Sequence, residues 1–143
     1  MPSRGPMRPP AFEEVDHTAD RALVVRGRSL QELFENAAFG MNRILGFRPA
    51  PGGEMQVKRI DLEAIDAESL LVCWLSELAY YAETESVGFE RFEFERFSPT
   101  ALSAAAFGRK AAEMEKAVKA VTYHDLAIRS EGGEFTATIV FDV

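Results

Sequence analysis

Negative charge gathers at the end of the chain. The carboxylate of Asp142 and the α-carboxylate of Val143 belong to adjacent residues. Because two like charges about 4 Å apart repel by roughly 4 kcal/mol at an effective dielectric of about 20, a structure that holds both groups, and any third carboxylate, favours a cation. A hard divalent cation such as Ca²⁺ or Mg²⁺ takes carboxylate and carbonyl oxygens as ligands and accepts water at its remaining positions. The pattern predicts a cation site here and leaves open which distant acid supplies the third carboxylate.

Other chemistry is sparse in this sequence. The chain has two histidines, His17 and His124, and one cysteine, so a zinc site with the usual nitrogen and sulfur ligands is not expected. It contains no H-E-x-x-H, glycine-rich phosphate, calcium-loop or G-x-S-x-G motif. His17 and His124 could act as a general base and its relay, but we favour histidines that bond to backbone groups in turns. Lys119 is a candidate contact for a phosphate or a partner's carboxylate, with a solvated surface lysine as the alternative.

The element that must hold the terminal carboxylates is a strand over residues 134–143. Apolar residues alternate along it, which is typical of a strand with one core face. The apolar side comprises Phe135, Ala137, Ile139 and Phe141, and the other side comprises Thr136, Thr138, Val140 and Asp142. An apolar strand that runs to the last position holds the terminal α-carboxylate in place beside Asp142.

Two helices are predicted from caps and periodicity. Residues 29–32, Ser-Leu-Gln-Glu, form a capping box, and apolar residues at three- and four-residue spacing continue to Leu45, with Gly46 as the end. Asp66 can cap a second helix that runs from Ala67 to about Glu83 and is more buried than the first.

The rest of the pattern predicts mostly strands. Strands are expected over residues 12–17, 22–25, 89–97 and 101–107, and over 55–64 with a bulge near Lys58. We expect an exposed loop or a fragment of helix over residues 108–116, and a mixture of strand and turn over 117–128. Between the first two strands, the pattern favours a polar turn in which Asp20 caps backbone amides. This order predicts an α+β fold with a mixed, mostly antiparallel sheet and two main helices.

Composition limits the classes of function. A chain of 143 residues suits one domain, and we expect residues 1–11 to form a disordered N-terminal tail and residues 12–143 a single domain. No apolar run approaches the roughly 18 residues of a membrane span, so we expect a protein that does not enter a membrane. The single cysteine, Cys73, is compatible with a reducing compartment, and we expect a cytoplasmic protein. The net charge of -7 argues against an extended phosphate-binding surface and suits a cation or a basic partner protein.

Three separate motifs, in this order, resemble the archease family. They are His17-Thr18-Ala19-Asp20, the segment Lys119-Ala120-Val121-Thr122-Tyr123-His124, and the closing residues Phe141-Asp142-Val143. The predicted first helix and the segment Leu70-Leu71-Val72-Cys73-Trp74-Leu75 fit the same pattern. The resemblance covers residues 12–143 and leaves only the N-terminal tail outside.

The resemblance implies a non-catalytic partner of an RtcB-type RNA ligase, the enzyme that joins RNA ends in tRNA splicing and RNA repair. Archeases promote guanylylation of that ligase's active-site histidine, allow multiple turnover and broaden the nucleotides it accepts. The implied fold has two strand-helix-strand-strand modules, one inserted into the other. RNA would be contacted only indirectly, through the ligase.

The resemblance also names a third ligand. The family carries a divalent cation, seen as Ca²⁺, with Mg²⁺ or Mn²⁺ as alternatives, and its ligands map onto Asp20, Asp142 and Val143. This replaces the cap that the pattern alone favours for Asp20. The family motifs further suggest that His17, Lys119 and His124 contact the partner or a phosphate.

Two other classes of function remain open. A metal-dependent phosphohydrolase or nucleotide-binding enzyme could use the same three carboxylates. A general chaperone or RNA-binding module would show salt-dependent RNA affinity without a ligase, which the low isoelectric point, about 4.9, disfavours.

Overall fold

The computed structural model describes residues 10–17 and 20–143. Residues 1–9 of the expected tail and Thr18–Ala19 of the expected turn lie outside the described residues, as does the side chain of His17. The elements follow in the order β1 (Phe12–His17), β2 (Asp20–Gly27), α1 (Leu30–Leu45), β3 (Arg48–Pro49), β4 (Met55–Glu63), α2 (Ala67–Glu85), β5 (Val87–Ser98), β6 (Ala101–Glu113), β7 (Ala120–Thr122), β8 (Arg129–Glu131) and β9 (Glu134–Asp142).

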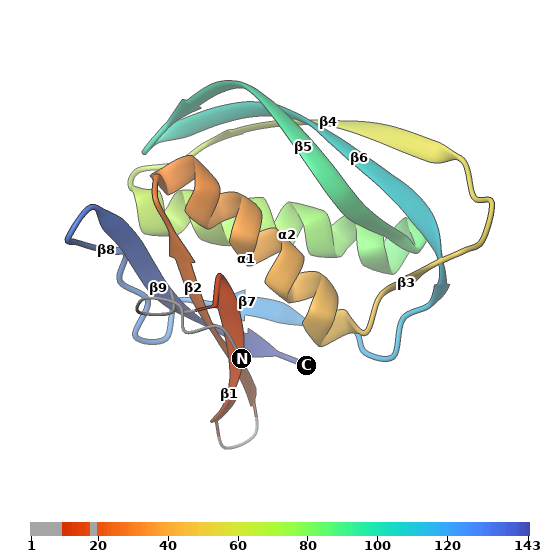
Figure 1. Cartoon of the computed structure of the whole chain (residues 1–143), viewed down its shortest axis with the longest axis horizontal. Coiled ribbons are helices and arrows are strands. Elements are labelled where there is room, and N and C mark those ends of the chain that lie inside the picture. Colours follow the sequence, from red (N-terminus) through yellow and green to blue (C-terminus); the bar gives the residue numbers. More distant parts are fainter. Residues whose placement is uncertain (1–9, 18–19) are drawn as a thin grey trace, which may run out of the picture.

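The two helices lie between two sheets, as Figure 1 shows. The first sheet has the order β1-β2-β9-β7, with β8 also paired to β9, and the second has the order β3-β6-β4, with β5 also paired to β6. Every strand pair among the described residues is antiparallel. Helix α1 contacts β2 and β5, and α2 contacts β4, β5 and β7. The predicted α+β class with two main helices is confirmed.

The order of the elements is nested. The segment β4-α2-β5-β6 forms one strand-helix-strand-strand unit, and it is inserted between α1 and the strands β7 to β9. After this insertion the chain returns to the first sheet, where β9 pairs with β2 over seven residue pairs from Arg21↔Phe141 to Gly27↔Phe135. The nesting therefore brings the two ends of the sequence into one sheet.

A shared core of apolar side chains joins the layers. Trp74 of α2 is fully buried, and its indole Nε1 donates a hydrogen bond of 3.0 Å to the carbonyl oxygen of Phe34 in α1. The Trp74 ring meets the rings of Phe92 and Phe94 on β5 at centroid distances of 5.0 and 5.4 Å. One side chain thus connects both helices and the second sheet.

The predicted caps bound both helices. The Ser29 hydroxyl accepts a hydrogen bond from the backbone N–H of Glu32 at 3.0 Å, and the Glu32 carboxylate accepts one from the N–H of Arg28 at 2.9 Å. Gly46 ends α1 in the left-handed region with φ 66°, where an L side chain would be strained. Asp66 accepts from the N–H of Ser69 at 2.7 Å at the start of α2. Within the described residues, neither helix is both long enough and apolar enough to cross a membrane.

We expect Ser29→Ala to lower the free energy of unfolding by about 1 kcal/mol, because it removes the acceptor for one of the first N–H groups of α1. Urea denaturation followed by circular dichroism measures this difference. Ser130→Ala removes an exposed hydroxyl from β8 and serves as the control. Equal stability of the two variants would show that the cap contributes nothing.

The predicted bulge near Lys58 is wrong. Strand β4 pairs with β6 without a register shift from Met55 to Glu63, and the shifts lie instead in β5. The change in apolar parity has another cause: the Lys58 ammonium forms an ion pair of 2.7 Å with Glu85 of α2 and lies over the Tyr81 ring. A lysine therefore takes a helix-facing position, while Val57 is 57% exposed on the other face.

The predicted loop or helix fragment over residues 108–116 is also wrong at its start, since β6 continues to Glu113. Gly108 to Lys110 pair with the first residues of β5, and Ala111 and Glu113 pair with β3. Gly108 permits a close approach, because a Cβ there would lie 2.6 Å from the carbonyl oxygen of Gly88. Backbone pairing with β3 and β5 therefore extends β6 through a segment whose side chains do not alternate between apolar and polar.

Candidate metal centre at the end of the first sheet

The register of the first sheet gathers predicted site residues in one row. His17 pairs with Asp20 across β1 and β2, and Ala120 pairs with Asp142 across β7 and β9. The β2–β9 ladder ends at Arg21↔Phe141, so its next step sets Asp20 opposite Asp142. The row across the four strands is therefore His17, Asp20, Asp142 and Ala120.

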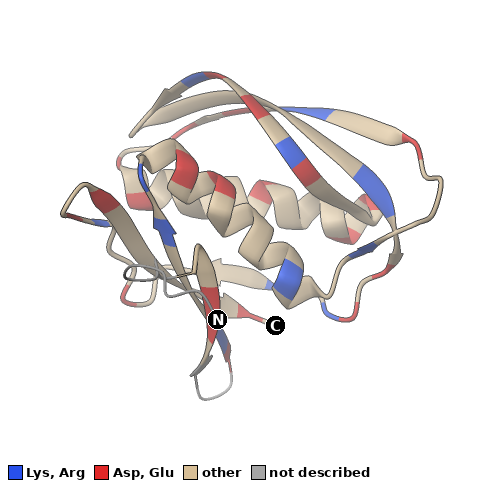
Figure 2. Ribbon diagram, viewed as in Figure 1, with Lys and Arg blue, Asp and Glu red and all other residues tan. Residues whose placement is uncertain are grey.

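The two carboxylates belong to the same face of the sheet, because directly opposed residues share a face and neighbours along a strand alternate. Leu23 and Phe141, on the other parity, are fully buried on the side of the helices. Asp20 is half-buried and Asp142 is exposed. The acidic end of β9 lies beside the C-terminus in Figure 2. The carboxylates thus sit at the rim of the sheet and are open to solvent.

Neither carboxylate has a charge partner among the side chains that the structure describes. The neighbouring arginine, Arg21, donates to Glu14 at 3.2 Å. Thr18 and Ala19, whose amides belong to the turn that Asp20 is predicted to cap, lie outside the described residues, so the structure does not test that cap. Two acids that share a row and have no charge partner among the described side chains repel each other, which raises the electrostatic free energy of this edge.

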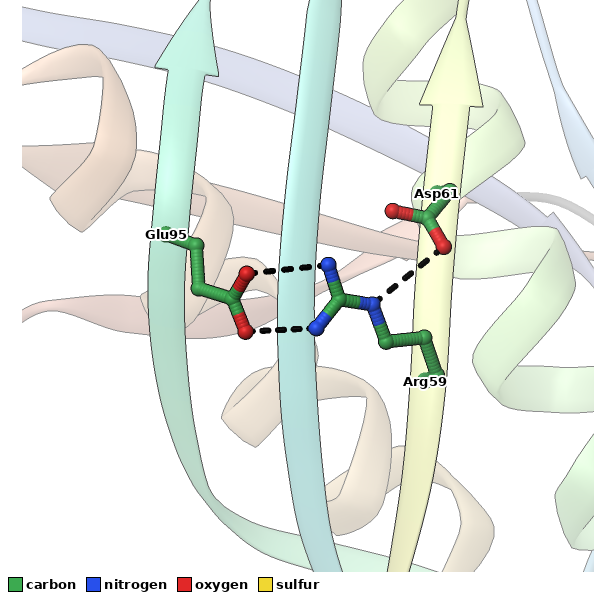
Figure 3. A network of polar contacts seen from close by, with 3 residues as sticks. All are labelled: Arg59, Asp61 and Glu95. Carbon is green, nitrogen blue, oxygen red and sulfur yellow. Dashed lines mark hydrogen bonds and ion pairs between the residues drawn. The ribbon is translucent and has the colours of Figure 1, made fainter.

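On the second sheet, by contrast, two exposed carboxylates form ion pairs with one arginine. Arg59 donates to Glu95 at 2.9 Å and to Asp61 at 3.4 Å (Figure 3). The Arg59 guanidinium lowers the pKa of Glu95, and the hydroxyl of Ser103 together with Arg59 lowers the pKa of Asp61. An arginine compensates these two carboxylates, whereas no side chain that the structure describes does so for Asp20 or Asp142.

The backbone around Asp142 is fixed from two sides. The backbone N–H of Lys119 donates to the carbonyl oxygen of Asp142 at 2.7 Å. Lys119 directly precedes β7 and therefore lies beside the row. The side chain of Val143 packs against the hydrophobic core, which holds the end of β9 in place. The structure therefore brings Asp20, Lys119, Asp142 and Val143 to one edge of the first sheet.

His124 lies farther along the same face. Its Nε2 atom forms an ion pair of 3.2 Å with Asp125, and its backbone N–H donates to the hydroxyl of Thr122 at 3.3 Å. It lines a cavity together with Arg26 and Arg129, two residues that the sequence patterns did not single out. Only the pairing of the strands places these two arginines at one cavity, and that pairing cannot be read from the sequence.

The oxygen atoms of the carboxylates at this edge are of the type that a hard cation binds. The two aspartates occupy opposed strand positions. In residues 10–17 and 20–143 no group of three or more histidine, cysteine, aspartate or glutamate side chains is placed so that it could hold a metal ion. A cation at this edge would therefore need a ligand besides the two aspartates, and the family resemblance assigns that part to the α-carboxylate of Val143.

Comparison with known proteins assigns a family. Residues 12–143 match the model of the Archease protein family (MTH1598/TM1083). A protein archease from Methanosarcina mazei is 34% identical over 151 residues and covers 100% of both chains. One from Sulfurisphaera tokodaii is 30% identical and covers 92% of this chain and 98% of its own length.

Solved structures show the same fold. A crystal structure of a Thermotoga maritima protein described as an archease and possible chaperone superposes with a TM-score of 0.70 at 25% identity, over 98% of this chain and 100% of the other. The solution structure of a Methanobacterium thermoautotrophicum protein gives a TM-score of 0.67 at 31% identity, over 93% of this chain and 99% of the other.

Proposed function

The chain belongs to the archease family, and from this premise we propose that it is a non-catalytic accessory protein that activates an RtcB-type RNA ligase in the cytoplasm. In this role it promotes guanylylation of the ligase and its multiple turnover in tRNA splicing or RNA repair. The observation that supports the proposal best is the row in which Asp20 faces Asp142 without a charge partner among the described side chains.

Asp20, Asp142 and the α-carboxylate of Val143 would hold a divalent cation, Ca²⁺ in our proposal, with Mg²⁺ or Mn²⁺ as alternatives. A cation bound there supplies open coordination positions for a phosphate or a partner's oxygen atom. The chain's own contribution is placement: β2 and β9 fix the two aspartates, and the Lys119 N–H fixes the backbone of Asp142. Lys119, exposed beside this row, is the proposed contact for the ligase or its nucleotide, and His17 and His124 are further candidates.

The overall charge suits such a partner. Acidic residues exceed basic ones by 23 to 16, and an RNA ligase presents a basic surface to its substrate. Complementary charge accelerates encounter and selects the partner more than it adds affinity. The partner would therefore bind RNA itself, while this chain contacts RNA only through the ligase.

Guanylylation of the companion ligase by GTP, measured with and without this protein across a series of Ca²⁺, Mg²⁺ and Mn²⁺ concentrations, tests the proposal. We expect a rise of at least about tenfold in the rate of ligase–guanylate formation, which corresponds to about 1.4 kcal/mol in the activation free energy. An unchanged rate at every metal concentration would contradict it.

The same assay without ligase separates the enzyme alternative. We expect the protein alone, with divalent metal, neither to consume GTP nor to process RNA. Turnover by the protein alone that is lost in Asp20→Asn would assign the three carboxylates to catalysis. Salt-dependent RNA binding in the absence of ligase would instead favour an RNA-binding module.

A further inference from the structure

The face of the first sheet that carries Asp20 and Asp142 also contains a cavity. Its volume is about 480 Å³, and the strands β2 and β9 form its floor while the chain from His124 to Arg129 forms a wall. Small-molecule sites are concave spaces of roughly 300–1,000 Å³ with an apolar lining and a few polar groups that fix orientation. This cavity has both an apolar lining and a few polar groups.

The polar part is one row of three adjacent strands. Thr136 of β9 pairs with Arg26 of β2 on one side and with Arg129 of β8 on the other. All three residues line the cavity, and directly opposed residues share a face. Two arginines therefore occupy the strand positions on either side of Thr136 at the same end of the cavity.

The two arginines differ in the contacts that their guanidinium groups make. One nitrogen of Arg26, Nη1, donates to the carbonyl oxygen of Pro10 at 3.1 Å and to Glu13 at 3.2 Å, which fixes the guanidinium and leaves its other N–H groups. Arg129 is exposed and has no ion pair with any described side chain. A fixed and an unpaired guanidinium together suit an anion with several oxygen atoms, since arginine binds phosphate through parallel N–H bonds.

The apolar part lies between this row and the acidic row. Val24 and Val140 line the cavity on the same face of the sheet, and His124 lies on the wall with Asp125 as its ion-pair partner. From Thr136 to Asp142 the strand rises by roughly 20 Å at about 3.4 Å per residue. An anion at the arginine row is thus far from the carboxylates, and a flat apolar group can occupy the space between.

We propose that this cavity binds a nucleoside 5′-monophosphate, with its phosphate at Arg26, Thr136 and Arg129 and its base against Val24, the more exposed of the two valines. A phosphate monoester carries about -1.5 to -2 charges near neutral pH. Arg129 supplies a positive charge to it, and Arg26, whose charge is partly compensated by Glu13, supplies N–H donors. A triphosphate brings more negative charge than this row compensates. The site is separate from the proposed cation centre and requires neither ligase nor metal.

The test is a titration of the full-length ¹⁵N-labelled protein with GMP in the presence of EDTA, followed by NMR. A purine is chosen because it presents the larger flat face to the apolar floor. We expect saturable shifts at the lining residues with a dissociation constant below about 1 mM. Guanosine and inorganic phosphate, titrated separately, are expected to bind at least about tenfold more weakly, because each makes only one set of contacts.

Variants decide which residues are responsible. Arg129→Ala is expected to weaken GMP binding at least about tenfold. Arg48→Ala, at an exposed arginine that pairs with Glu113 on the second sheet, and Asp142→Asn are expected to leave it unchanged. Equal binding by Arg129→Ala, shifts that cluster elsewhere, or binding of a short RNA without binding of GMP would each overturn the proposal. None of these outcomes depends on ligase stimulation, so the two proposals fail independently.

Discussion

Asp142→Asn is expected to reduce stimulation of ligase guanylylation to the level of the ligase alone, while the melting temperature changes by no more than about 2 °C. The substitution keeps the shape of the side chain and removes one of the proposed anionic ligands, so the affinity of a hard cation falls. Stability should not fall, because Asp142 is exposed and its carboxylate has no described partner to lose. The guanylylation assay and a thermal melt are run on the same preparation.

Asp20→Asn is the companion variant, since Asp20 occupies the neighbouring position of the same row. Glu131→Gln removes an equally exposed carboxylate from β8 at the other end of the sheet and is the matched control. If either aspartate variant unfolds, the residue is a structural cap and the cation centre must be abandoned. If Asp142→Asn stimulates fully, the acidic row is not the site of activation.

Val143 requires a different experiment, because its proposed ligand is the α-carboxylate and not the side chain. One glycine added after Val143 moves that carboxylate away from the row and keeps the packing of the valine side chain against the core. We expect stimulation to fall as it does in Asp142→Asn. Full activity of the extended chain would remove Val143 from the ligand set and leave the two aspartates.

The sequence contains most of the information about single elements. The Ser29 and Asp66 caps bond as their spacing predicts, because each cap and the backbone N–H group that donates to it are only three residues apart. The alternation predicted for β9 is confirmed in part: Ala137, Ile139 and Phe141 are buried, but Val140, which the pattern places on the opposite face, is buried as well, at 3% exposure. The hydrogen bond of a helix cap and the buried face of a strand both depend on residues that lie close together along the chain, so the sequence predicts them.

Information about pairs of distant elements is what the sequence lacks. The mistaken loop after Gly108 and the mistaken bulge near Lys58 both depend on partners from other strands and helices. The juxtaposition of Asp20 and Asp142 followed from the family resemblance and not from any periodicity. The row of Arg26, Thr136 and Arg129 had neither kind of signal, because only the strand register places Thr136 beside Arg129 and beside Arg26, which lies more than a hundred positions away in the sequence.

Trp74→Ala is expected to lower the free energy of unfolding by about 3–5 kcal/mol, which is a large share of the roughly 5–15 kcal/mol typical of a domain. The substitution leaves a cavity between α1, α2 and β5 and removes the hydrogen bond to the Phe34 carbonyl oxygen. Urea denaturation must be followed by circular dichroism, because Trp74 is the only tryptophan in the chain and its loss removes the fluorescence signal. Tyr80→Ala, at a ring that is 56% exposed, is the control with a small expected effect.

Trp74→Phe separates packing from hydrogen bonding, since it keeps an aromatic ring and removes the indole N–H. We expect it to cost about 1–3 kcal/mol, less than the alanine variant, and to remain folded at 25 °C. Because the acidic row lies at the rim of the first sheet and Trp74 lies among the helices and β5, the folded phenylalanine variant should stimulate the ligase as the parent chain does. A loss of less than about 1 kcal/mol in Trp74→Ala would show that this side chain does not connect the layers. Loss of stimulation in a fully folded Trp74→Phe would show that the helices, and not the carboxylate row alone, determine activation.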